Sequence, residues 1–156
     1  MTRAMAVVMA GLMTCGWTHA APSSTRFISH RGESMVCPEN TMAAFRAAVE
    51  RGADGFECDV YLTKDNEIVC LHDSTAKRTG GLDVKPSQAT LAELQALDAG
   101  SWKGPQFKGE RMPTLDEALA LARDGFEIYV EIKCGTEILP RLAERSEEHT
   151  SELQSQ

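Results

Sequence analysis

The feature that most restricts the fold of this chain is a regular alternation of short strand patterns with amphipathic helix patterns. Strand patterns occupy residues 26–29, 55–63, 68–71 and 127–133. One helix pattern follows the first strand, and another precedes the last one. This alternation predicts an α/β protein with a parallel sheet.

Both helices carry start and stop signals. Asn40 or Thr41 can accept hydrogen bonds from the free N–H groups of the first helix, and Gly52 is expected to end it. The second helix is expected to begin at the capping box Thr114–Glu117 and to end at Gly125. Loops therefore follow the carboxyl ends of the strands, where parallel α/β barrels build their active sites.

Residues 74–112 differ in composition from the segments around them, being rich in Gly, Lys, Pro and Ser. They contain one helix pattern, which a second capping box opens at Thr90–Glu93. We expect this segment to be a small insertion after the strand that ends at His72.

Both ends of the chain depart from the α/β pattern. Residues 1–21 combine a basic start, a short apolar run and small residues at the exit, which predicts a secretory signal peptide. We therefore expect an exported protein, periplasmic or secreted, with no transmembrane helix in the mature chain. Residues 145–156 resemble the conceptual translation of a sequencing adapter and are interpreted as an artefactual tail, which leaves the domain at residues 22–144.

Charge and cysteine content narrow the classes of partner. The chain has 16 Lys and Arg against 23 Asp and Glu, a net charge of -7, which disfavours nucleic acid and anionic membranes and suits a cation. Cys15 lies in the predicted signal peptide. The other cysteines show no C-x-x-C spacing, and both disulfides and buried free thiols remain open for them. They are Cys37, Cys58, Cys70 and Cys134.

Carboxylates lie on one side of two predicted strands. Glu57 and Asp59 are two residues apart, as are Glu131 and Lys133, so the side chains of each pair point the same way. Edge strands could carry such charges towards solvent, but helices are expected to cover both faces of a parallel sheet. Carboxylate oxygens are the ligands that Ca²⁺ and Mg²⁺ prefer, and these three carboxylates predict a divalent-cation site.

Two histidines and two cations complete the candidate site. His30 and His72 both lie just past strand ends, and a pair of imidazoles can act as base and acid in one turnover. Arg31 and Lys133 are candidates to hold an anion such as phosphate.

The order and spacing of several motifs over residues 27–133 resemble the glycerophosphodiester phosphodiesterase family. The motifs are His30-Arg31-Gly32, Pro38-Glu39-Asn40-Thr41, Phe45, Gly55-Phe56-Glu57-Cys58-Asp59-Val60, Thr63-Lys64-Asp65, His72-Asp73, Arg78-Thr79, Pro113-Thr114-Leu115 and Glu131-Ile132-Lys133. The resemblance implies a (β/α)₈ barrel and hydrolysis of glycerophosphodiesters, as small-molecule substrates, to glycerol 3-phosphate and an alcohol.

The same resemblance assigns roles to individual residues. It implies that Glu57, Asp59 and Glu131 bind Ca²⁺ or Mg²⁺ and that His30 and His72 are the acid and base. It also implies that Arg31 and Lys133 contact phosphate. Glu39 and Asn40 match polar residues that support the first loop, and the insertion with Arg78-Thr79 matches a lid over the glycerol side.

A (β/α)₈ barrel typically has about 250 residues, whereas this chain offers three barrel strands, or four if residues 68–71 form a separate one. We therefore expect the N-terminal part of a truncated barrel, inactive by itself. Two alternatives stay open: a related barrel phospholipase, of the sphingomyelinase D or phosphatidylinositol-specific kind, and a non-catalytic binding protein on the same barrel. The head group of the substrate is left open.

Overall fold

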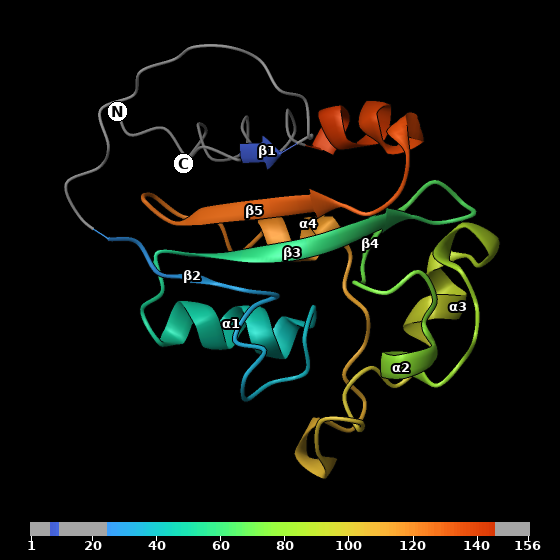
Figure 1. The fold of residues 1–156 in the computed structure, drawn as a ribbon, viewed down its shortest axis with the longest axis horizontal. Helices are drawn as coiled ribbons and strands as arrows, with labels where there is room; N and C mark the ends of the chain where they lie inside the picture. The colour runs from blue at the N-terminus through green and yellow to red at the C-terminus, as the bar shows by residue number, and fades with distance from the viewer. Residues whose placement is uncertain (1–6, 10–24, 146–156) are drawn as a thin grey trace.

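A computed structural model describes residues 7–9 and 25–145, which form an α/β fold around a mainly parallel sheet (Figure 1). The strands of the sheet lie in the order β1-β5-β3-β2, and all neighbours along this path run parallel. These strands are β1 (Val7–Met9), β2 (Ile28–Ser29), β3 (Gly55–Leu62) and β5 (Glu127–Ile132). The predicted parallel sheet is therefore confirmed.

The predicted strand at residues 68–71 is not a further barrel strand. It forms β4 (Ile68–Cys70), which folds back on β3 as an antiparallel hairpin, with Ile68 opposite Leu62. The polar segment Lys64–Glu67 is too short for the helical crossover that a parallel partner needs. Three parallel strands, β2, β3 and β5, thus represent the barrel order in this chain.

Helices α1 (Met42–Glu50) and α4 (Leu115–Leu119) pack against the sheet through an apolar core. Thr41 caps α1, and its hydroxyl accepts a hydrogen bond from the backbone N–H of Ala44. Phe45 of α1 stacks on Phe56 of β3 with 4.4 Å between the ring centroids. Aromatic stacking of this kind fixes the helix against the strand that carries the predicted carboxylates.

Helix α4 is shorter than expected. It begins at the predicted capping box, with Thr114 and Glu117 each bonding the other's backbone N–H, but it ends at Leu119 rather than near Gly125. After Leu119 the backbone bonds tighten to a spacing of three residues, as from the Ala122 N–H to the Leu119 carbonyl. This tightening is a common way to finish a helix.

The inserted segment, residues 74–112, has short helices and an apolar cluster of its own. Its helices are α2 (Lys77–Gly80), η1 (Pro86–Gln88), α3 (Leu91–Gln95) and η2 (Pro105–Phe107). Leu94 and Met112 are buried against Val69 of β4, and the predicted capping box at Thr90 is present. In Figure 1, α2 and α3 lie beyond the carboxyl end of β3.

The two ends of this segment meet at β4. The backbone N–H of Cys70 donates to the carbonyl of Pro113 over 2.8 Å, and Val69 forms a β-bridge with Thr114. The chain therefore leaves β4 and returns to it at one place, which leaves the path from β3 to β5 independent of the segment between.

The chain ends, within the described residues, in η3 (Thr136–Ile138) and a helical turn at residues 139–145, which bury Ile138 and Leu142 in the core. The predicted signal peptide at residues 1–21 lies outside the described residues except for β1, and the predicted tail lies outside them except for Arg145. Within residues 25–145 all four cysteines are free thiols. No described helix is long and apolar enough to span a membrane.

Candidate active site

The first loop, residues 30–41, extends the sheet beyond the end of β2. Strand β2 stops opposite Phe56, so the rest of this edge of β3 lacks a strand partner. The Gly32 N–H donates to the Glu57 carbonyl over 3.2 Å, and the Asp59 N–H donates to the side-chain carbonyl of Asn40 over 3.1 Å. The loop therefore satisfies the backbone that a neighbouring strand would otherwise pair.

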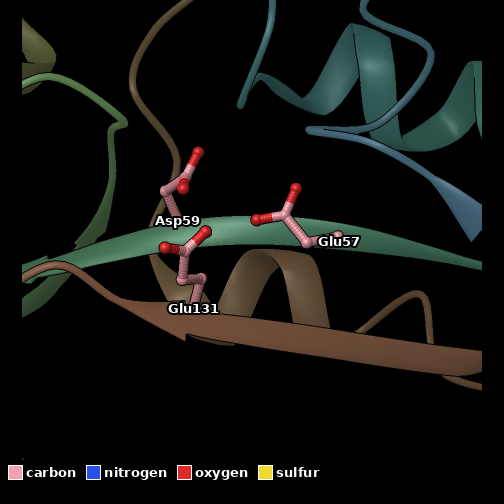
Figure 2. A group of neighbouring side chains, drawn as sticks. All are labelled: Glu57, Asp59 and Glu131. Carbon is pink, nitrogen blue, oxygen red and sulfur yellow. The ribbon is translucent and has the colours of Figure 1, made fainter. Parts of the chain in front are cut away.

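Three carboxylates gather at the carboxyl ends of β3 and β5 (Figure 2). Glu57 and Asp59 point to the same side of β3, and Glu131 lies directly opposite Asp59 in the register with β5. One oxygen from each carboxylate lies within 4.8 Å of the others. The group that the sequence predicted is thus assembled by the period of the strand and by the register of the sheet.

Glu57 is the member of this group with an unused oxygen. Its Oε2 accepts a hydrogen bond from the backbone N–H of Arg31 over 2.9 Å and lies 3.8 Å from Nε2 of His30. Its Oε1 is buried and has no hydrogen-bond partner among the described residues. Burial raises the pKa of Glu57, and the neighbouring Asp59 raises it further. A cation beside Oε1 would relieve both effects, so the site fits a hard metal ion.

Asp59 is completely buried and has two cationic neighbours. Nζ of Lys133 lies 3.1 Å from its Oδ1, and Nε of Arg31 lies 3.4 Å from its Oδ2. The side-chain amide of Asn40 also donates to Oδ2 over 2.8 Å. A buried carboxylate needs such partners, because an isolated buried charge is costly.

Lys133 lies between two of the three carboxylates. Its ammonium donates to Oε1 of Glu131 over 2.7 Å as well as contacting Asp59. Partial burial lowers the pKa of Lys133, but the bonds to Glu131 and Asp59 outweigh that effect and raise it overall. The bond from Lys133 lowers the pKa of Glu131, and the nearby His72 adds to this effect. A fixed positive charge therefore lies beside the acidic group.

The two predicted histidines approach from different segments. His30 is exposed in the first loop and lies near Glu57. His72 follows β4, and its Nδ1 lies 2.8 Å from Oδ1 of Asp73. The structure places both at the edge where the parallel strands end, while their roles in a reaction stay predictions.

Glu39, predicted only to support the first loop, makes contacts that sequence reasoning missed. Its carboxylate accepts from Nη1 of Arg31 over 3.0 Å and from both terminal nitrogens of Arg78, over 2.7 and 3.0 Å. Arg78 also binds Asp73. The adjacency of His72 and Asp73 was a signal for part of this network, but the link to Glu39 spans 39 positions.

The profile of the glycerophosphoryl diester phosphodiesterase family matches residues 30–152, a range that contains every candidate residue named above. The chain belongs to this family. A glycerophosphodiester phosphodiesterase of Caldanaerobacter subterraneus subsp. tengcongensis is 47% identical over 122 residues, covering 78% of this chain and 50% of the relative. A glycerophosphodiester phosphodiesterase of Bacillus altitudinis is 35% identical over 83% of this chain and 54% of its own.

Solved structures of family members share the fold. A glycerophosphodiester phosphodiesterase from Agrobacterium tumefaciens aligns with a TM-score of 0.75 and 33% identity, covering 81% of this chain and 54% of that one. A phosphodiesterase from Oleispira antarctica, in complex with the product sn-glycerol-3-phosphate, aligns with a TM-score of 0.67 and 36% identity, covering 85% and 52%. These glycerophosphodiester phosphodiesterases are barrel proteins, and the chain spans about half the length of the relatives it matches. The predicted partial barrel is thereby confirmed.

Proposed function

We propose that the protein carrying this segment hydrolyses glycerophosphodiesters to glycerol 3-phosphate and an alcohol. The observation that carries the proposal is the meeting of three carboxylates with Lys133 and Arg31 at the carboxyl ends of β3 and β5. Family membership supports it, as does a relative that holds sn-glycerol-3-phosphate as its product. A phosphodiester is an anion, and an acidic group could not approach it without cationic neighbours.

We further propose that Glu57, Asp59 and Glu131 hold a divalent ion, Ca²⁺ or Mg²⁺. The unpartnered Oε1 of Glu57 and the all-oxygen donor set fit such an ion. When bound there, the ion supplies positive charge that stabilises the charge developing on a phosphoryl group. The ion must share Asp59 and Glu131 with the ammonium of Lys133, which keeps that ammonium beside the bound anion.

The remaining roles follow from the chemistry of the side chains. His30 and His72 exchange protons with the nucleophile and the leaving alcohol, because imidazole can change charge near neutral pH. Arg31 and Lys133 hold the phosphoryl oxygens. The Arg31 guanidinium is oriented for this task by Glu39 and Asp59, which accept from it on one side.

Export and truncation form a separate part of the proposal. We propose that residues 1–21 are removed as a signal peptide and that the mature protein works outside the cytoplasm, as the apolar run and small-residue exit indicate. Mass spectrometry of the protein from a secreting host should then show a mature N-terminus near Ala21. We also propose that residues 22–144 by themselves are inactive, because the matched barrels are about twice as long.

The proposed activity is tested on the longest reading frame that contains residues 22–144. Purified protein is given sn-glycero-3-phosphocholine with Ca²⁺ or Mg²⁺, and glycerol 3-phosphate is measured before and after addition of a chelator. Glu131→Gln should lower kcat at least about 100-fold, whereas Glu127→Gln at the opposite end of β5 should leave it within about twofold. Equal activity of the two variants would contradict the site. Release of phosphocholine instead of glycerol 3-phosphate would favour a phospholipase.

A further inference from the structure

Asp73 determines which ring nitrogen of His72 carries a proton. Its Oδ1 lies 2.8 Å from Nδ1 of His72, and a carboxylate can only accept a hydrogen bond there. The neutral imidazole is therefore held with hydrogen on Nδ1, which leaves Nε2 free to accept a proton. His72 and Asp73 are adjacent in the sequence, so this contact alone would not hold both side chains in place.

Arg78 of α2 supplies the missing restraint. Its Nε and Nη2 donate to the two oxygens of Asp73 over 2.7 and 3.0 Å, so the carboxylate is gripped at both ends. The same guanidinium donates to both oxygens of Glu39 in the first loop. A planar guanidinium can make two such paired contacts, whereas an ammonium cannot.

These contacts leave Arg78 little capacity to bind substrate. Four of its N–H groups point to carboxylates, and its guanidinium carbon lies over the ring of Trp102, 5.6 Å from the centroid. Arg31 reaches the same network from the other side, because its Nη1 donates to Glu39. One continuous chain of charged contacts thus joins the candidate phosphate-binding Arg31 to the candidate acid–base residue His72.

We propose that Asp73 and Arg78 are positioning residues that fix the tautomer and orientation of His72 and link it, through Glu39, to Arg31. This inference rests on the proposed function, in which His72 transfers a proton. It gives the inserted segment a task in proton transfer in addition to covering the site. Arg78 also lowers the pKa of Asp73 well below its usual range, so Asp73 stays ionised across neutral pH.

The first readout concerns the tautomer of His72 and does not depend on activity. Ring ¹⁵N shifts of the reading frame used above are recorded at about pH 8.5, where imidazoles are neutral, with His72→Gln identifying the signal. The native protein should show Nδ1–H, and Asp73→Ala should show a mixture of both tautomers. The same tautomer in both proteins would overturn the inference, whatever the activity of the enzyme proves to be.

The second readout separates positioning from substrate binding. Asp73→Ala and Arg78→Lys should each lower kcat about 10- to 100-fold while KM changes less than about threefold. A rise in KM with unchanged kcat would make Arg78 a substrate ligand and overturn the inference. Asp83→Ala is the matched control, because Asp83 also pairs with a cation of α2, Lys77, but on the exposed surface. Should Asp73→Ala fail to fold, Arg78→Lys keeps the charge and supplies both readouts, with the same two outcomes deciding.

Discussion

Replacing Asn40 by glycine tests how firmly the first loop holds the site. The side chain of Asn40 donates to Oδ2 of Asp59 and accepts from the Asp59 N–H, and both residues are buried. Its backbone has a φ of 53°, in the left-handed region. Glycine adopts that conformation freely, so Asn40→Gly removes the two side-chain contacts without straining the loop.

The expected loss of stability follows from the two contacts. A hydrogen bond to a charged group contributes about 1.5–3 kcal/mol, and a buried N–H left without a partner costs about 1–3 kcal/mol. Because water can reach part of the space that the side chain leaves, we expect a combined loss of about 2–4 kcal/mol for Asn40→Gly. Asn40→Ala should lose about 1 kcal/mol more, because alanine tolerates the left-handed region poorly.

Equilibrium unfolding in urea, followed by circular dichroism, measures these differences. Asn66→Gly is the matched control, because Asn66 also has a left-handed backbone, with a φ of 61°, but lies in an exposed turn. It should change the free energy of unfolding by less than about 0.5 kcal/mol. The reasoning fails if Asn40→Gly is no more destabilising than Asn66→Gly.

Three other predictions concern a helix start, an ion pair and the acidic group. Thr114→Ala should lower the free energy of unfolding by about 1 kcal/mol in urea, because it removes half of a capping box. The pKa of Asp73 is lowered in the folded state, mainly by Arg78, so its stabilising effect is complete above about pH 4 and is lost as the pH falls further. Thermal melting from pH 6 to 3 should show a shallower acid loss in Asp73→Asn than in the native protein. Added Ca²⁺ or Mg²⁺ should raise Tm, and Glu57→Gln should abolish this rise; an equal rise in both proteins would place the ion elsewhere.

Local signals in the sequence predicted much of the fold. The alternation along β3 placed Glu57 and Asp59 on one side, and the capping boxes at Thr90 and Thr114 are both present. These features depend on residues within one turn or one strand of each other. The end of α4 was wrong, because Gly125 ends the turn that follows the helix rather than the helix itself.

Contacts between distant segments were less accessible to sequence reasoning. The pairing of β4 with β3 depends on a hairpin, and period alone cannot distinguish it from a further parallel strand. Glu39 and Arg78 are far apart in the chain, and nothing local indicates that their side chains meet. The position of Lys133 between Asp59 and Glu131 likewise needs the register of two strands.

The meeting of the two ends of the inserted segment at β4 has a consequence for how such enzymes can diversify. Since Cys70 and Pro113 are hydrogen-bonded to each other, residues between them can be shortened, lengthened or exchanged without altering the spacing of β3 and β5. Segments transplanted between family members at these two points should therefore be tolerated by the scaffold. Only a transplant that retains counterparts of Asp73 and Arg78 should also preserve the geometry of His72, which separates the portion of the segment free to vary from the portion that is not.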